Sequence, residues 1–191
     1  TTTGTAGAGS VYGVYNYVYY GSGSGSYYNN TISNLKCGGN SGTIYGWYNY
    51  YADGPMTIRN NKIIGLQNNS TLAGASTIYG IYDLTYVGAT GAAVVVNYQN
   101  NLVHAGNYNV MADSTKSSGG NYGVYITTGS ARTVNFYYNT ILNTGKSTQP
   151  AYGAHSVFNN TTNAKMLLMN NIFYNDAMNA SVAPTSKSTI I

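Results

Sequence analysis

Charged residues are scarce in this sequence of 191 residues: they make up 6% of the chain, whereas about a quarter is typical of soluble domains. The eight basic residues stand singly along the chain, and against four acidic residues they give a net charge of +4. Scattered positive charges do not form the basic stripe that follows a phosphate backbone. Nucleic acid is therefore not an expected partner.

Cysteine and long apolar runs are also lacking. Cys37 is the sole cysteine, which excludes an internal disulfide. No apolar run approaches the roughly 20 residues that a helix needs to cross a bilayer, so membrane insertion is not expected. His104 and His155 have no partner at the spacing of metal ligands and are interpreted as solvated or turn residues. The sequence predicts neither a metal site nor a cofactor.

Carboxylates are too few and too dispersed for paired acid and base chemistry. The four of them are Asp53, Asp83, Asp113 and Asp176. They share no position in the repeats described below, whereas glycoside hydrolysis needs two carboxylates facing one groove. We interpret them as turn and loop residues, assign no catalytic residue, and expect the protein not to be an enzyme.

The sequence is instead rich in tyrosine, glycine, asparagine and β-branched residues. With 22 Tyr the chain is polar without being charged. Disordered chains are poor in aromatic and β-branched residues, which favour strands, so this composition predicts a folded all-β protein.

A Tyr-Gly motif recurs five times. Its copies cover residues 11–15 (VYGVY), 44–48 (IYGWY), 78–82 (IYGIY), 121–125 (NYGVY) and 151–155 (AYGAH). A second motif lies between these copies, in residues 27–32 (YYNNTI), 58–63 (IRNNKI), 98–103 (YQNNLV), 136–141 (FYYNTI) and 168–173 (LMNNIF). In the second motif a large apolar residue, an Asn and a further apolar residue keep their places.

The strict alternation of the two motifs predicts a solenoid. Successive Asn positions of the second motif are separated by 31, 40, 38 and 32 residues, and short β-type segments at this period indicate a parallel β-helix rather than helical repeats. We expect one domain, residues 1–191, with about five coils. Residues 1–10 and 183–191 lie outside the repeats, and we expect them to make contacts between subunits.

The repeated Asn is expected to form an internal ladder. Asn tolerates the left-handed conformation of a tight turn, and its amide can bond to the equivalent Asn in the next coil. The predicted ladder consists of Asn30, Asn61, Asn101, Asn139 and Asn171.

The Tyr-Gly motif is expected to build an outward aromatic stripe. Strict alternation along a strand puts Tyr12 and Val14 on one face and Tyr15 on the other. If the aliphatic positions point inward, the outward stripe consists of Tyr15, Tyr48, Tyr82, Tyr125 and, in the fifth copy, His155. We predict that the four tyrosines stack on one another or bind glycans.

The segments "TIYGIYD", "NFYYNTILNTG" and "MNNIFYN" resemble the repeats of large secreted and cell-surface β-helix proteins of Bacteroidetes and related bacteria. The resemblance extends from residue 11 to about residue 180. It implies a right-handed parallel β-helix and a bacterial protein that is extracellular or attached to the cell surface, where such coils build a stalk or fibre.

Two functions are weighed on this basis. The first is a non-enzymatic structural subunit that self-associates into a homopolymer, because a β-helix ends in open strand edges and low charge removes repulsion between stacked copies. The second is a carbohydrate-binding or adhesive module in which the tyrosine stripe stacks on sugar rings. An uncapped end is equally expected of a piece cut from a longer solenoid.

Overall fold

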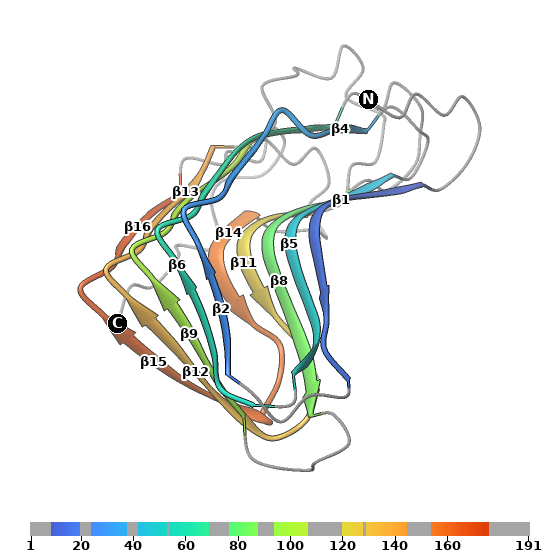
Figure 1. The fold of residues 1–191 in the computed structure, drawn as a ribbon. Helices are drawn as coiled ribbons and strands as arrows, with labels where there is room; N and C mark the ends of the chain where they lie inside the picture. The colour runs from blue at the N-terminus through green and yellow to red at the C-terminus, as the bar shows by residue number, and fades with distance from the viewer. Residues whose placement is uncertain are drawn as a thin grey trace.

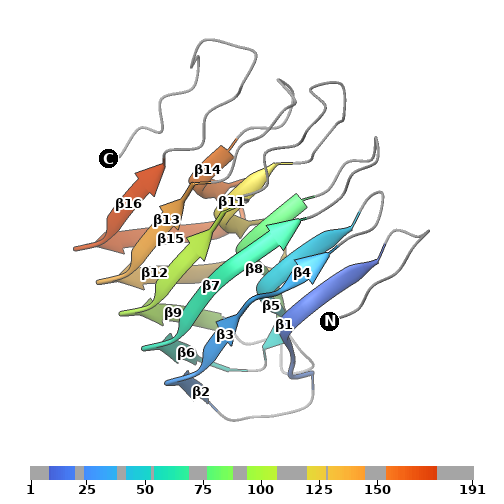
Figure 2. The same ribbon diagram turned by 90° about the horizontal axis from the view of Figure 1, so that it is seen from above.

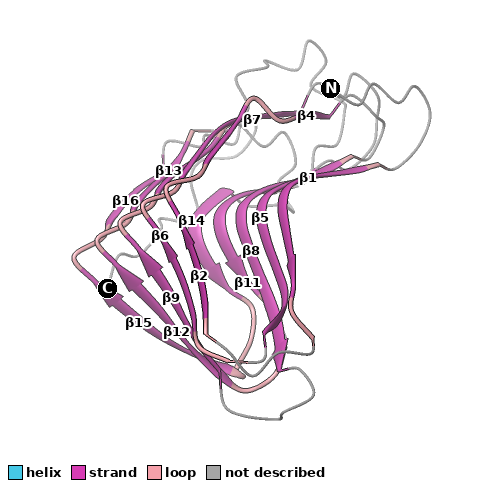
Figure 3. Cartoon of the chain, in the orientation of Figure 1, coloured by secondary structure: helices cyan, strands magenta, loops and turns pink. Residues whose placement is uncertain are grey.

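The fold was analysed in a computed structural model of the chain. The structure describes residues 9–19, 24–37, 42–52, 54–68, 77–87, 94–106, 120–127, 129–144 and 154–175. These residues form strands, turns and short connections, and none of them is helical (Figure 3).

Three parallel sheets build the molecule, and the chain visits them in a fixed order (Figures 1 and 2). Sheet A contains β1(Ser10–Tyr17), β5(Thr43–Ala52), β8(Thr77–Val87), β11(Asn121–Ile126) and β14(Ala154–Asn159). Sheet B contains β2(Gly25–Tyr28), β6(Met56–Arg59), β9(Val94–Gln99), β12(Arg132–Tyr137) and β15(Ala164–Met169). Sheet C contains β3(Thr31–Ser33), β7(Lys62–Asn68), β10(Leu102–Ala105), β13(Thr140–Asn143) and β16(Ile172–Asn175), and β4(Lys36–Cys37) also pairs with β7.

This arrangement confirms the prediction of an all-β parallel solenoid. Each circuit of the chain passes through sheets A, B and C before the next strand of sheet A begins. The predicted number of about five coils is too high. Three coils rather than five, namely β5–β7, β8–β10 and β11–β13, have hydrogen-bonded neighbours on both sides, while β1–β3 and β14–β16 form the two edges.

The core lies between the three sheets and consists of stacked apolar columns. In sheet C the inward column is Ile32, Ile63, Val103, Ile141 and Phe173. In sheet B it is Tyr27, Ile58, Tyr98, Phe136 and Leu168. The middle members of both columns are fully buried. These are the two apolar positions of the second motif, so the repeat in the sequence is the repeat of the core.

The turn between sheets B and C differs from the prediction in one respect. The left-handed conformation belongs to the residue before the repeated Asn, not to that Asn itself. The left-handed residues are Asn29, Asn60, Asn100, Tyr138 and Asn170, with φ between 51° and 58°. Four of these five are asparagines, because Asn adopts positive φ at lower cost than other residues with a Cβ.

Tyr138 is the exception in this column, and its replacement is expected to stabilise the protein. A residue with a Cβ pays about 1–2 kcal/mol for the left-handed conformation, and Asn pays less. Because the Tyr138 ring is 60% exposed, little packing is lost in Tyr138→Asn. We expect the free energy of unfolding to rise by about 1 kcal/mol in urea titrations. The reverse change, Asn100→Tyr, serves as the control and should lower it; equal stability of all three proteins would contradict the explanation.

Sheet A departs from strict alternation at its glycines. Along β5 the burial pattern makes Gly46 and Trp47 both buried, with Tyr45 and Tyr48 both facing out. A Cβ on Gly46 would lie 2.4 Å from Cγ2 of Ile63 and 2.5 Å from the carbonyl oxygen of Gly80. The strands of sheet A bend along their length (Figure 1), and the backbone of Gly46 lies directly against the inward column of sheet C. Glycine therefore recurs because sheets A and C meet too closely for a side chain.

The bend corrects the predicted orientation of Tyr12. Alternation placed Tyr12 inward with Val14, but its ring is 42% exposed and stacks on Tyr45. Both tyrosines of the first four Tyr-Gly motifs consequently reach the outer face of sheet A.

Candidate functional site: the aromatic face of sheet A

Two columns of rings run along the outside of sheet A. The first aromatic column consists of Tyr12, Tyr45, Tyr79, Tyr122 and His155. The second aromatic column consists of Tyr15, Tyr48, Tyr82, Tyr125 and Phe158. The four tyrosines predicted as a stripe are thus brought together, and a second column that the sequence analysis missed lies beside them.

The rings pack in two different ways. Within a column, neighbouring rings lie nearly parallel: the Tyr48 and Tyr82 centroids are 5.0 Å apart with planes at 10°. Between the columns the contact is edge to face, as for Tyr79 and Tyr82 at 4.8 Å and 71°. Offset-stacked and edge-to-face pairs are the arrangements that the ring quadrupole favours, at about 0.5–1.5 kcal/mol each. The face is therefore a continuous, mutually supported layer.

The fifth repeat has a different register from the predicted one. His155 pairs with Tyr122 and Phe158 pairs with Tyr125, so His155 belongs to the first aromatic column and Phe158 ends the second. Ser156 stands where the other coils have glycine. The Tyr-Gly pair of residues 152–153, on which the prediction was based, lies outside the described residues.

Access to the face is greatest at the first coil. Tyr12, Tyr15 and Tyr17 expose 42%, 48% and 53% of their surface. The tyrosines of the middle coils are covered further by their neighbours and are only partly exposed. A flat ligand would find its largest free ring area at β1.

Burial among the rings changes the acidity of the phenols. Desolvation raises the pKa of Tyr45 to about 12, and the negative charge of nearby phenolates adds to the effect. Desolvation likewise raises the pKa of Tyr48 and Tyr79. In each case the folded protein favours the neutral phenol because an ion among stacked rings loses its hydration.

The raised pKa values predict a loss of stability in alkali. A phenol whose pKa is higher in the folded state contributes stability that is complete below the unfolded value, about 10, and is lost as the pH rises through the folded value. For Tyr45 this window runs from about 10 to about 12. We expect the urea midpoint to fall steadily across it. Phenolate absorbance should show a delayed titration in the folded protein only; one shared transition near pH 10 with and without denaturant would contradict this.

The five predicted ladder asparagines form a second continuous column, at the corner between sheets B and C. The Nδ2 amide of each donates to the Oδ1 oxygen of the next: Asn30 to Asn61 at 2.9 Å, Asn61 to Asn101 at 3.1 Å, Asn101 to Asn139 at 3.0 Å and Asn139 to Asn171 at 3.0 Å. The backbone N–H of each donor Asn bonds to the same oxygen. Asn61, Asn101 and Asn139 are almost fully buried, so these bonds supply the partners that buried amides require.

A network of buried polar side chains, which the sequence did not predict, crosses the core. Tyr98 donates its hydroxyl hydrogen to Oδ2 of Asp83 at 2.8 Å, and Nε of Arg132 lies 3.0 Å from Oδ1 of the same carboxylate. Neither charged side chain is exposed to solvent. The prediction of a turn or loop role for Asp83 is therefore wrong: it lies in β8, pairs with Asn49 of β5, and points into the core.

Arg132 also fixes the connection between β11 and β12. It donates to the carbonyl oxygens of Thr127, Ser130 and Asp83 at 2.9, 3.2 and 3.0 Å. Burial and the Asp83 carboxylate hold the pKa of Tyr98 well above its usual value. These buried polar side chains link sheet A, through Asp83, to sheet B, through Tyr98 and Arg132.

The remaining candidates for chemistry are dispersed. His104 lies in β10 with Nε2 2.8 Å from Oγ1 of Thr144, and His155 lies in β14 and stacks on Tyr122. Both stand in strands rather than in turns, and both remain partly exposed to solvent. Burial lowers the pKa of both imidazoles. Cys37 is buried. Asp53, Asp113 and Asp176 lie outside the described residues. Within the described part of the chain, no three His, Cys or acidic residues gather in a way that could hold a metal ion.

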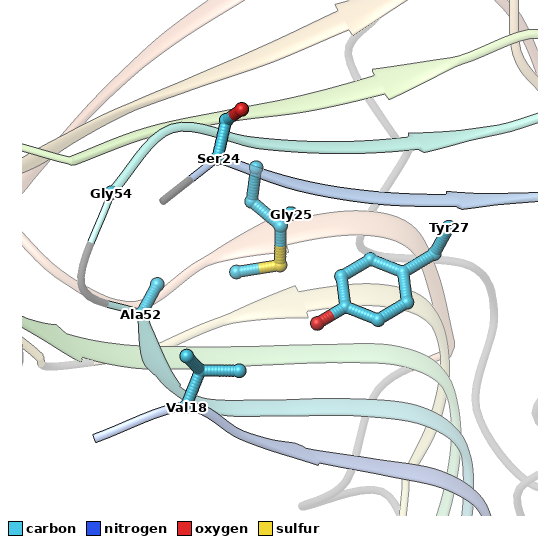
Figure 4. Close-up of a pocket in the computed structure, with 7 residues that line it drawn as sticks. Val18, Ser24, Gly25, Tyr27, Ala52 and Gly54 are labelled. Atoms are coloured by element: carbon cyan, nitrogen blue, oxygen red, sulfur yellow. The ribbon is translucent and has the colours of Figure 1, made fainter. Parts of the chain in front are cut away.

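A pocket of about 270 Å³ opens at the first two coils, between sheets A and B (Figure 4). Its lining is Val18, Ser24, Gly25, Tyr27, Ala52, Gly54 and Met56. The Tyr27 hydroxyl donates to Oδ1 of Asn16 at 2.8 Å and is occupied by that bond. The lining is largely apolar and contains no ionisable group except Tyr27, which makes it a poor setting for acid and base catalysis.

The predicted terminal segments are described only in part. Residues 1–8 and 183–191 lie outside the described residues. Gly9 already belongs to the first coil, since its carbonyl oxygen accepts from the Thr43 amide at 3.1 Å. Among the residues with described structure there is no helix that is long and apolar enough to span a membrane.

Comparison of the chain with protein-family models, with curated proteins and with solved structures finds no match. The parallel solenoid is therefore established by the pairing of the strands alone.

Proposed function

We propose that this chain is a non-enzymatic structural subunit of an extracellular or cell-surface filament or stalk. One observation carries the proposal: the Asn ladder and both aromatic columns run without interruption from the first coil to the last. Side chains repeated in every coil serve the stack itself, whereas a catalytic site needs residues that are special to one place.

The finer assignment follows the resemblance of the repeats. We propose a right-handed β-helix in a single domain, similar to the secreted and cell-surface β-helix proteins of Bacteroidetes and related bacteria. The low charge of 6% supports self-association, because stacked copies repel one another little. The expected partner is a second copy of the chain.

Negative-stain electron microscopy of the full chain over a dilution series tests the structural role. We expect uniform fibres that persist on dilution, because strand-edge contacts extend an existing sheet. Dispersed short rods at every concentration would overturn the proposal.

Glycan binding by the aromatic face is the second candidate, favoured by the exposure of Tyr15 and Tyr17 at 48% and 53%. Rings of this kind offer flat apolar surface for stacking on sugars. The test is retention on immobilised polysaccharides of Tyr15→Ser/Tyr17→Ser. The matched control is Tyr28→Ser/Tyr174→Ser, which removes two rings of similar exposure, 52% and 50%, from sheets B and C. Loss of retention in the first variant alone supports binding, and equal retention of both variants contradicts it.

A further inference from the structure

The Asn ladder has a direction. The first four ladder asparagines each donate the side-chain amide to the Oδ1 oxygen of the next ladder Asn in sequence, and among the described residues no ladder bond between side chains runs the other way. The same Nδ2 group also donates to a backbone oxygen of the preceding coil, as Asn171 does to Phe136 at 2.8 Å. The ladder is thus an ordered row of donors and acceptors.

This direction leaves the two ends chemically different. Within the described residues, Oδ1 of Asn30 accepts no hydrogen bond at the first coil, and the backbone N–H of Asn171 donates none at the last. The main chain repeats the pattern: the Ile172 amide donates to the Asn139 oxygen at 2.8 Å, and the Lys62 amide to the Asn30 oxygen at 2.8 Å. By the same pattern, the Thr31 amide is left as a donor and the Asn171 oxygen as an acceptor.

Only one mode of association satisfies these groups. Two first coils brought together would place Asn30 oxygen against Asn30 oxygen, which is repulsive. If the last coil of one copy stacks on the first coil of another, the N–H groups of Asn171 in the first copy face Oδ1 of Asn30 in the second. The backbone N–H of Thr31 in the second copy then faces the backbone oxygen of Asn171 in the first. Buried polar groups that find such partners cost little, whereas unpaired ones cost about 1–3 kcal/mol each.

The side chains of the two ends match in the same register. Tyr12 and Tyr15 begin the aromatic columns with exposed faces, and His155 and Phe158 end them. The column Thr31, Lys62, Leu102, Thr140 and Ile172 follows the outer face of sheet C from one end to the other. Ile172 is 61% exposed. It would lie beside Thr31 of the next copy at the strand spacing of about 4.8 Å.

We propose that copies of this chain join head to tail and in register, with β14, β15 and β16 of one copy pairing with β1, β2 and β3 of the next. This inference rests on the proposed structural function and specifies its joint. A contact between unlike ends that repeats along the axis of the solenoid generates an open fibre rather than a closed dimer.

A cysteine pair tests the register. Thr31→Cys/Ile172→Cys is made in the full chain, together with Cys37→Ala to remove the native thiol. Neighbouring strands hold Cα atoms within the range of about 4.4–6.8 Å that a disulfide spans. Mild oxidation should convert the protein into a series of reducible covalent oligomers, and peptide mass spectrometry should find residue 31 linked to residue 172.

The matched control is Thr31→Cys/Lys165→Cys in the same background, because Lys165 is exposed on the same edge but lies in sheet B. It should give no such series. Links of 31 to 31 or of 172 to 172, or fibres by microscopy without the 31 to 172 link, would overturn the head-to-tail joint while leaving the structural function standing. Absence of both links and fibres would overturn both.

A charge pair supplies an independent readout. Thr31→Lys/Ile172→Lys places like charges opposite each other across the joint, which is destabilising, whereas Thr31→Glu/Ile172→Lys places opposite charges there. We expect the first variant to need a higher protein concentration for fibre formation and the second to assemble as the unaltered chain does. Equal assembly of the two variants would contradict the proposed register.

Discussion

Arg132→Met is expected to lower the free energy of unfolding by about 3–5 kcal/mol. The change leaves the Asp83 carboxylate, which has no exposed surface, without its ionic partner. An unpaired buried charge is far more costly than the pair itself is stabilising. The carbonyl oxygens of Thr127 and Ser130 lose their donor as well, so the connection from β11 to β12 is released. The measurement is the urea midpoint.

Two further variants separate the charge from the packing. Asp83→Asn/Arg132→Met removes both charges and puts an amide at a position that Asn49 occupies in the neighbouring coil, so it should recover much of the loss. Arg59→Met removes an exposed cation that lies 5.0 Å over the Tyr28 ring, at a cost of about 1 kcal/mol or less. An effect of Arg132→Met no larger than that of Arg59→Met would show that the ion pair does not hold the sheets.

Asn101→Ala is the second change with a large expected effect, about 3 kcal/mol or more, because it orphans several buried groups at once. Oδ1 of Asn101 accepts from the side chain and backbone of Asn61, and its Nδ2 donates to Asn139 and to the Ile58 oxygen. Each partner left buried and unpaired costs about 1–3 kcal/mol.

The position in the ladder should decide the size of the effect. Asn171→Ala removes the same side chain from the last coil, where in the unassembled protein solvent can replace part of the bonding, and should cost clearly less in urea titrations of unassembled protein. Asn101→Asp keeps the accepting oxygen but loses the donor, so its free energy of unfolding should lie between those of Asn101→Ala and the unaltered chain. If the new carboxylate is charged and buried, its free energy of unfolding should be lower than both. Equal losses for Asn101→Ala and Asn171→Ala would contradict a cooperative internal ladder.

The sequence predicts the solenoid because its turn between sheets B and C has a constant length. Two residues, such as Asn60 and Asn61, always join the strand of sheet B to the strand of sheet C, so the motif aligns without gaps. The identity of the left-handed residue could not be deduced from the pair alone, since both positions are rich in Asn. The structure assigns positive φ to the first and the side-chain ladder to the second.

Only one of the two aromatic columns could be predicted from the sequence. Alternation assumes that buried and exposed positions follow one another strictly, whereas in β5 Gly46 and Trp47 are both buried and Tyr45 and Tyr48 on either side both face outward. The error in the fifth repeat has another cause: the pair at residues 152–153 imitates the motif, while the coil that pairs with β11 carries Ser156 instead of glycine. A strand register is decided by the neighbouring strand, which a single segment does not reveal.

The Asp83 and Arg132 pair is separated by 49 residues, and nothing in the local sequence of either residue indicates the other. A signal was nevertheless present. Asn16, Asn49 and Asp83 all stand two residues after the inward aliphatic position of the Tyr-Gly motif, which makes them a polar column inside the core. A recurring polar residue at an inward position predicts a buried network.

The ladder of asparagines has a further physical property. From Asn61 to Asn139, each side-chain oxygen accepts from the ladder Asn of the coil before and each side-chain nitrogen donates to that of the coil after, so these amide dipoles are aligned along the axis. Hydrogen bonds in such a chain polarise one another, and each becomes stronger as the row grows. Every added coil thus reinforces those already in place, and elongation of the row is cooperative in the way that growth of a helix is.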